Sequence, residues 1–218
     1  MEERLMQPFP SVQVSIDAQR VILRASPAWH ALSSALLGGG FTDFCSLFIY
    51  HVDKNYDHPE PWHHLQEIAL IERLPPPTIG LLTAASLERT QVIVLDEGEV
   101  RVCALVTAGV SNATSAGLTP PLRLTQAHTI NIVLLVNQAL SSTAMVNAVI
   151  TATEAKTDTL NRLGIKTPQG EVASGTSTDT VIIAHNGKGE PLKYAGPATL
   201  VGWLMARAVR LALSQALR

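Results

Sequence analysis

Residues 130–136 (INIVLLV) and residues 180–184 (TVIIA) carry the strongest structural signal in the chain. Continuous apolar runs of this kind are typical of strands that are covered on both faces. The segment between them predicts a helix over Ser141–Leu163, because Ser141 or Ser142 can cap its start and Gly164 can end it. Its apolar stripe comprises Met145, Ala148, Val149, Ala152, Ala155, Leu160 and Leu163. Strand, long helix and strand predict a right-handed crossover between two parallel strands.

The N-terminal half predicts antiparallel hairpins. Val12, Val14 and Ile16 alternate with polar residues, and Val21–Leu23 returns after a turn. Val92–Leu95 and Val100–Val106 flank Gly98, which supplies the positive φ of a hairpin turn. Further elements predicted are a strand over Phe44–Val52, a helix over His63–Leu74 and a last helix from Pro197 to about Ala216. The expected fold is one α/β (α+β) domain over residues 1–218, with a mixed sheet of N-terminal hairpins and a C-terminal strand–helix–strand crossover.

Composition excludes several classes of protein. The 218 residues are 46% hydrophobic and only 16% charged, against roughly 25% in an average protein. The net charge of −2, without a basic stripe, argues against nucleic acid as a partner. No apolar run reaches the roughly 20 residues of a membrane span, and no basic and then apolar leader opens the chain. Because Cys45 and Cys103 lie in apolar, strand-like runs as buried thiols would, we expect a cytoplasmic protein.

Three polar, nearly uncharged loops adjoin the predicted strands and the last helix. They are residues 107–113 (TAGVSNA), 173–179 (ASGTSTD) and 194–199 (YAGPAT). Loops of this composition offer backbone N–H and hydroxyl donors, which suit an oxyanion or an amide. Each loop taken alone is better explained as a simple turn, since turns favour the same residues. As a set, they predict one cleft on which all three loops converge.

Two carboxylates stand out near these loops. Asp179 precedes a buried strand, where an acid needs a partner. Glu154 lies on the long helix in a polar stripe with Asn147, Thr151 and Asp158, which ordinary solvent exposure also explains. Lys156 is two residues from Glu154 and therefore cannot pair with it on one helix face, so it meets either a substrate carbonyl or the following loop.

The segment DHPEPWHHLQE at residues 57–67 is a weaker signal. His63 and Glu67 are spaced i, i+4 and would share a metal ion on a helix, which leaves open a metal-dependent hydrolase that uses His58–Glu67. The chain has no HExxH motif and no Cys/His pair at zinc spacing, so we expect no metal ligands. It also lacks the G-x-S-x-G elbow of α/β-hydrolases and the GxGxxG dinucleotide fingerprint, and we expect no cofactor.

Taken in order, five segments resemble the CbiZ family, the adenosylcobinamide amidohydrolases. They are residues 107–113 (TAGVSNA), 129–137 (TINIVLLVN), 151–160 (TATEAKTDTL), 173–184 (ASGTSTDTVIIA) and 194–202 (YAGPATLVG). Ser33–Ala35 ahead of Gly38–Gly40, and Gly80–Ala85, are similar to the family's N-terminal segments, so the likeness spans most of the chain. One departure is the glycine triplet, which carries no Asn side chain where many members of the family have one nearby.

The resemblance implies hydrolysis of the amide that joins aminopropanol to a propionyl side chain of the corrin ring. The products would be adenosylcobyric acid and 1-amino-2-propanol, in corrinoid salvage. The implied partner is a small-molecule corrinoid, whose amide-fringed rim suits Asn, Ser and Thr better than charged side chains. The sparse surface charge also fits a broad apolar wall or a homodimer interface.

An amide hydrolase needs an activated nucleophile, an oxyanion donor and a proton for the leaving amine. The candidate catalytic residues are Glu154, Asp179 and Lys156, with one carboxylate as general base for water and the other as acid or orienting group. The oxyanion donors expected are backbone N–H groups around Gly175–Ser177, helped by Asn112 or Lys156. Expected substrate contacts are Ser111, Asn112, Asn131, Gly175, Thr176, Ser177 and Thr178. A covalent route through Thr176, Ser177 or Thr178 stays open, although no His adjoins these hydroxyls. A corrinoid-binding module without turnover also stays open.

Overall fold

The computed structural model describes residues 3–121 and 129–218. In the N-terminal half the elements are β1 (Arg4–Phe9), β2 (Val12–Ile16), β3 (Arg20–Ser33), β4 (Gly40–His51), α1 (Pro61–Ile71), β5 (Thr78–Thr83) and the 3-10 turn η1 (Leu87–Arg89). They are followed by β6 (Gln91–Glu97), β7 (Val100–Ala108), β8 (Ala113–Thr114), β9 (Ile130–Val136), α2 (Ser142–Arg162), β10 (Gly175–Thr176), β11 (Thr180–His185) and α3 (Leu200–Ala216).

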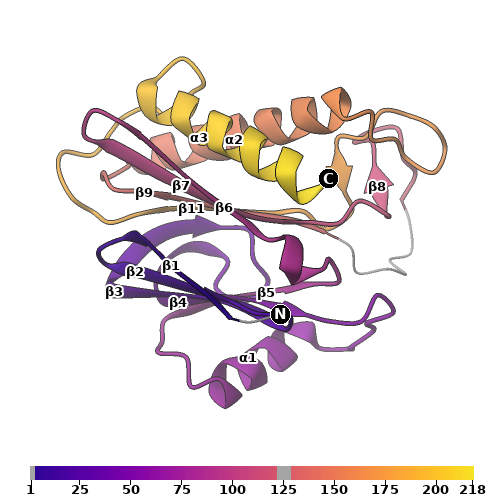
Figure 1. The fold of residues 1–218 in the computed structure, drawn as a ribbon, viewed down its shortest axis with the longest axis horizontal. Coiled ribbons are helices and arrows are strands. Elements are labelled where there is room, and N and C mark those ends of the chain that lie inside the picture. Colours follow the sequence, from indigo (N-terminus) through magenta and orange to yellow (C-terminus); the bar gives the residue numbers. More distant parts are fainter. Residues whose placement is uncertain (1–2, 122–128) are drawn as a thin grey trace.

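One mixed sheet organises the described residues. Its strands lie in the order β1-β2-β3-β11-β9-β7-β6, and β4 and β5 extend from the other side of β3. The first part of β3 pairs with β2 and the last part with β11, so the long strand joins two halves of the sheet. These halves face each other, with α2 and α3 on one outer side and α1 on the other (Figure 1). The result is a four-layer α–β–β–α arrangement.

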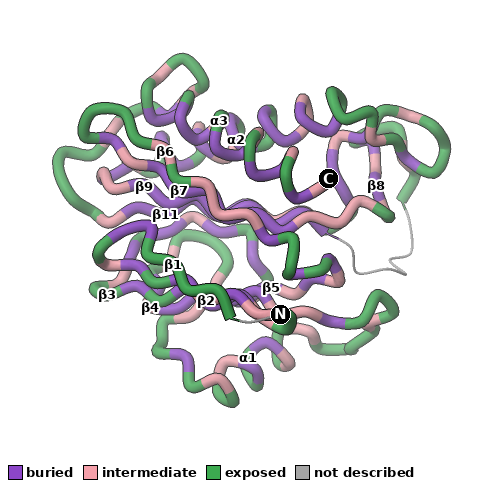
Figure 2. Tube along the Cα trace, viewed as in Figure 1, coloured by how far each residue is buried: buried purple, intermediate pink, exposed green. Residues whose placement is uncertain are grey.

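Successive side chains of the central strands point to opposite faces of the sheet and pack in two different hydrophobic cores. In β7, Val102 and Ala104 pack with α2 and α3, whereas Cys103 and Leu105 pack between the two sheet halves. All seven residues of β9 are buried, and the central strands are buried along most of their length (Figure 2). The prediction that residues 130–136 form a strand covered on both faces is therefore confirmed. A third, smaller core lies under α1 and contains Ile22, Phe48, Leu65, Ile68 and Leu74.

The C-terminal crossover is confirmed. β9 and β11 are parallel, with Thr180 opposite Asn131, and α2 connects them. The hydroxyl of Ser141 accepts a hydrogen bond from the backbone N–H of Ala144 at 3.1 Å, and Gly164 has the left-handed φ of +68° that ends the helix. α3 starts later than predicted, at Leu200 instead of Pro197, because Thr199 caps it by accepting from the N–H of Gly202 at 3.1 Å.

The predicted hairpins are also confirmed, but the N-terminal half contains more. β2–β3 and β6–β7 are antiparallel, and Gly98 has a φ of +59°. The structure adds the edge strand β1 and a second parallel pair, β4 and β5, connected through α1. Gly80 in β5 allows close packing there, since a Cβ would lie 2.7 Å from the Phe48 ring. The helix α1 ends at Ile71, three residues before the predicted Leu74.

Two further expectations concern membranes and thiols. None of the helices in the described part of the chain is long and apolar enough to cross a membrane. Cys103 is buried, and burial raises the pKa of its thiol to about 12, whereas Cys45 is only partly buried. Neither thiol is in a disulfide.

His185, the last residue of β11, makes stability depend on pH. Its side chain is buried beside His30, and its Nδ1 accepts a hydrogen bond from the N–H of Gly187 at 3.1 Å. Burial, and then the neighbouring His30, lower the pKa of His185 from 6.5 to about 4. Between these two pKa values His185 is protonated in the unfolded chain but neutral in the folded chain. The free energy of unfolding therefore falls as the pH decreases from about 6.5 to about 4.

We therefore expect H185N, which keeps a side-chain acceptor for Gly187, to flatten this pH dependence. From about pH 7 to pH 4.5, the free energy of unfolding of the variant should fall less than that of the parent chain, by at most about 3 kcal/mol. Urea unfolding at several pH values measures this difference. Parallel stability curves for the two chains would contradict the assignment.

Candidate active site

A two-stranded ribbon brings two of the three predicted loops together. β8 pairs antiparallel with β10, so that Ala113 lies opposite Thr176 and Thr114 opposite Gly175. Beside this ribbon, the side-chain amide of Asn112 donates to the Ser177 hydroxyl at 3.0 Å. Residues 107–113 and 173–179 thus form one structure, as the sequence predicted.

Asp179 is the centre of this structure. Its Oδ1 accepts from the Thr176 hydroxyl at 2.5 Å and from the Ile130 N–H at 3.2 Å. The N–H of Thr176 lies 3.1 Å from both carboxylate oxygens, and the Lys156 ammonium forms an ion pair with Oδ2. A carboxylate has about four lone-pair sites, so these donors occupy the group almost completely. They fix its orientation toward Thr176.

Lys156 reaches this carboxylate from α2. Its side chain is only 8% exposed, and a buried ammonium needs such a partner to offset its lost hydration. Of the two contacts expected for Lys156, the structure therefore has the one with the following loop. Gly175 makes the contact possible, because a Cβ at this position would lie 2.2 Å from Asp179 Oδ2 and 2.6 Å from Lys156 Nζ.

A cavity of about 410 Å³ adjoins Thr176. It is lined by uncharged residues that follow the first loop or belong to the second, namely Thr114, Ser115, Ala116, Gly117, Thr119, Pro120, Thr176 and Ser177. Residues 114–120 were not among the predicted site residues, although their sequence, TSAGLTP, continues the composition of the preceding loop. An uncharged cavity lined by a residue whose hydroxyl is bonded to a fixed carboxylate can hold a neutral amide near an acid–base group.

Glu154 is not brought to this group. Side chains two residues apart on a helix point about 200° apart, so Glu154 faces away from the direction that Lys156 takes to Asp179. Glu154 is exposed, and no hydrogen bond or ion pair joins its side chain to another of the described residues. The polar stripe predicted around it is divided: Thr151 is buried and donates to the Ala195 carbonyl at 3.0 Å, while Asp158 pairs with Arg162 and Arg210.

The remaining predicted contacts differ in their access to the cavity. Asn131 is buried and donates to the Thr107 hydroxyl at 3.0 Å, away from the cavity lining. Ser111 is exposed in the turn before Asn112, and Thr178 is exposed with its carbonyl accepting from the Thr129 hydroxyl at 2.7 Å. The loop at residues 194–199 does not join the site: it leads into α3 at the end opposite β8 and β10 (Figure 1).

The His-rich segment forms its own cluster around α1. His64 Nδ1 lies 2.8 Å from the Tyr56 hydroxyl, and the rings of His58 and His64 stack with centroids 5.2 Å apart. His63 pairs with Glu60 instead of sharing a ligand position with Glu67. Among residues 3–121 and 129–218, no three His, Cys, Asp or Glu side chains are placed to hold a metal ion.

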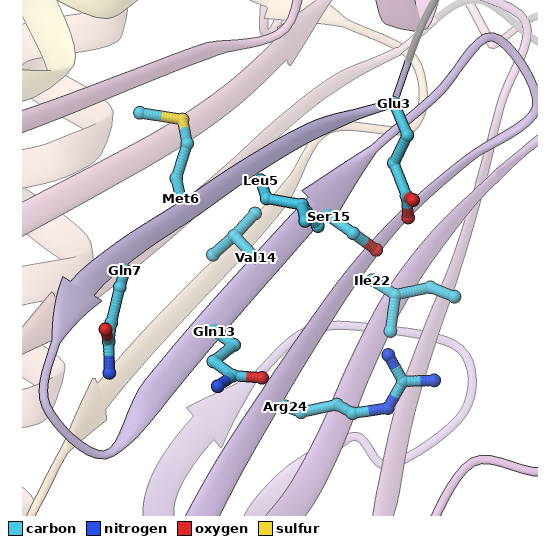
Figure 3. A pocket seen from close by; sticks show the side chains of 9 residues that line it. All are labelled: Glu3, Leu5, Met6, Gln7, Gln13, Val14, Ser15, Ile22 and Arg24. Carbon is cyan, nitrogen blue, oxygen red and sulfur yellow. The ribbon is translucent and has the colours of Figure 1, made fainter.

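A second hollow, of about 350 Å³, lies on the open face of β1, β2 and β3 (Figure 3). Its lining includes the charged side chains of Glu3 and Arg24, with Gln7 and Gln13 between apolar neighbours. None of the predicted site residues lines it. Of the two hollows, the cavity beside Thr176 is therefore the one lined by predicted site residues, Thr176 and Ser177.

Two solved structures are similar to this chain at low sequence identity. A protein from Pyrococcus horikoshii OT3 has a TM-score of 0.47 and 10% identity, covering 93% of this chain and 77% of that one. The L-aminopeptidase D-Ala-esterase/amidase from Ochrobactrum anthropi has a TM-score of 0.44 and 11% identity, covering 99% of this chain and 82% of that one.

Sequence comparison gives a closer relationship. The sequence pattern of the family described as CbiZ, adenosylcobinamide amidohydrolase, matches residues 7–218. The adenosylcobinamide amidohydrolase of Methanosarcina mazei is 32% identical over 207 residues, which cover 91% of this chain and 94% of that protein. The chain belongs to the adenosylcobinamide amidohydrolase (CbiZ) family.

Proposed function

We propose that this protein hydrolyses the amide between aminopropanol and the corrin side chain of adenosylcobinamide. Water adds across the C–N bond, and the products are adenosylcobyric acid and 1-amino-2-propanol, as in corrinoid salvage. Family membership and the name of the Methanosarcina mazei relative support this substrate. The observation that carries the proposal is Asp179, held by Lys156 and hydrogen-bonded to a hydroxyl at the rim of an uncharged cavity.

The cavity suits the amide-bearing side chain of the substrate. Its lining offers hydroxyl and backbone groups and no charge, which matches a neutral amide and alcohol. The Ser177 hydroxyl accepts from Asn112, so its own proton is left to donate to the substrate carbonyl oxygen. The N–H of Thr176 is directed at Asp179, so we propose Ser177, positioned by Asn112, as an oxyanion donor in its place.

Asp179 is the acid–base group in this proposal. It accepts a proton when the nucleophile attacks and returns it to the leaving nitrogen, which the amide needs because an amine anion is a poor leaving group. Lys156 holds the other carboxylate oxygen and is a positioning residue. Glu154 was the other candidate base, and its exposed position on α2 favours Asp179.

The activity is tested by incubating the chain with adenosylcobinamide, with and without a chelator, and separating the corrinoids by chromatography. We expect adenosylcobyric acid in both reactions. Binding without product would identify a corrinoid-binding module instead. Product that disappears only with chelator would favour a metal-dependent hydrolase and would direct attention to the segment His58–Glu67.

The E154Q variant separates the two carboxylates. Because Glu154 is exposed and contacts neither Lys156 nor Asp179, we expect its turnover to stay within about threefold of the parent enzyme, the range of an ordinary surface change. The measurement is kcat with adenosylcobinamide. A decrease in kcat of more than about a hundredfold, the contribution typical of a general acid or base, would instead assign a catalytic role to Glu154.

We further propose that the enzyme acts in the cytoplasm, where its two thiols remain reduced. The partner proposed is the corrinoid itself; the net charge of −2 gives no electrostatic attraction to nucleic acid. A homodimer remains an expectation. Light scattering at several protein concentrations measures the oligomeric state directly.

A further inference from the structure

Thr176 occupies the position that an attacking nucleophile requires. Thr176 is one of the residues that line the cavity, and its hydroxyl donates to Asp179 Oδ1 at 2.5 Å. Among the described residues, it is the only hydroxyl side chain that is hydrogen-bonded to this carboxylate. A hydroxyl that is bonded to a fixed carboxylate, in a residue that lines a cavity, is poised to lose its proton as it attacks.

The two neighbouring hydroxyls are arranged differently. Ser177 Oγ accepts from Asn112 and bonds to no carboxylate in residues 3–121 and 129–218. Thr178 is exposed, and its backbone carbonyl accepts a hydrogen bond from the Thr129 hydroxyl. The three hydroxyls of the segment Thr176–Thr178 are therefore arranged differently, and among the described contacts it is the Thr176 hydroxyl that bonds to Asp179.

A water molecule has less room beside the base. Ile130 N–H, Thr176 N–H, the Thr176 hydroxyl and Lys156 already surround the two carboxylate oxygens. To be activated by Asp179 in the first step, a water molecule would have to displace one of these donors. The Thr176 hydroxyl is already hydrogen-bonded to Asp179, so it can pass its proton to this carboxylate without displacing another donor.

We propose that the amide is cleaved through a covalent ester on Thr176, an inference that rests on the proposed function. Thr176 Oγ1 forms a bond to the amide carbon while its proton passes to Asp179. The C–N bond then breaks, and Asp179 gives this proton to the departing nitrogen of 1-amino-2-propanol. Water next attacks the adenosylcobyryl ester and loses a proton to Asp179, which returns it to Oγ1. The sum is one amide and one water converted to one acid and one amine.

The kinetic test compares substitutions at this position. T176S keeps the hydroxyl, and its turnover should stay within about tenfold of the parent; T176A and the nearly isosteric T176V remove it, and both should lose about a thousandfold or more. The matched control is T153V, which changes an exposed threonine of α2 outside the cavity lining and should retain activity. Turnover of T176A or T176V within about tenfold of the parent would overturn the covalent route while leaving the hydrolase function in place.

A threonine that merely orients Asp179 would also be sensitive to substitution, so a second measurement is needed. Hydroxylamine is added during turnover of adenosylcobinamide and of an analogue in which ethylamine replaces aminopropanol. A common ester on Thr176 gives the same ratio of hydroxamate to acid from both substrates, because the leaving amine has departed before partitioning. Ratios that differ between the substrates would contradict the ester. A parent enzyme that turns over neither substrate would instead remove the proposed function.

Discussion

Replacing Asp179 by asparagine is expected to lower kcat with adenosylcobinamide by about 10²–10⁴-fold, the usual contribution of a general acid–base group. The variant keeps the shape of the side chain but cannot accept the Thr176 proton. The matched control is D158N, which also removes a salt-bridged aspartate, but one that pairs with Arg162 of α2 and Arg210 of α3. We expect D158N to keep its turnover.

D179N also leaves Lys156 buried without its partner, which costs about 3–5 kcal/mol of stability by analogy with other broken buried pairs. The double variant K156M/D179N separates this effect from catalysis. Because both charges are removed together, its free energy of unfolding should recover toward the parent value, while its turnover should stay as low as that of D179N. Chemical unfolding and kcat are measured on the same samples. A folded D179N or double variant with turnover within about threefold of the parent would contradict the role of Asp179.

Adding a single methyl group at Gly175 is expected to have the second large effect. The new Cβ would lie 2.2 Å from Asp179 Oδ2 and 2.6 Å from Lys156 Nζ, so one or both groups must move. Overpacking of this kind costs about 1–3 kcal/mol. Displacement of the acid–base group by even 1 Å can lower turnover by about a hundredfold.

The control for G175A is G196A. Gly196 has no positive φ, and no atom lies within 4 Å of the position of its Cβ, so alanine is accommodated there. We expect G196A to keep both its melting temperature and its kcat. Thermal unfolding and turnover check the pair. A G175A variant that is indistinguishable from G196A in both measurements would show that the close approach of Lys156 and Asp179 to this backbone is unimportant.

The crossover could be predicted from local pattern, whereas the N-terminal topology could not. The runs at 130–136 and 180–184 are apolar because both of their faces are covered, and the helix between them has a serine cap and a terminal glycine, so sequence and structure agree residue by residue. β5 contains Gly80 and follows a proline run, features that locally favour a loop; its strand pairing depends on contact with Phe48 in β4. That contact is tertiary and leaves no periodic pattern in the sequence.

The candidate site shows the same division. Asp179 could be singled out because an acid beside a buried strand needs a partner, and helix spacing could exclude a pair between Glu154 and Lys156. Sequence reasoning could not identify Lys156 as the partner of Asp179, since the two residues meet through the β8–β10 ribbon and the missing side chain of Gly175. It also placed the loop at 194–199 in the cleft, but this loop lies between β11 and the start of α3, at the end of the molecule opposite β8 and β10.

The most direct measurement is a crystal structure of the T176A variant with adenosylcobinamide bound. We predict that the scissile amide enters the cavity of residues 114–120, with its carbonyl carbon about 3–3.5 Å from where the Thr176 hydroxyl would lie and its oxygen toward Ser177. An amide bound instead beside Glu154, in the hollow of β1–β3 or against the histidines of α1 would contradict the assignment of this cavity as the site of hydrolysis.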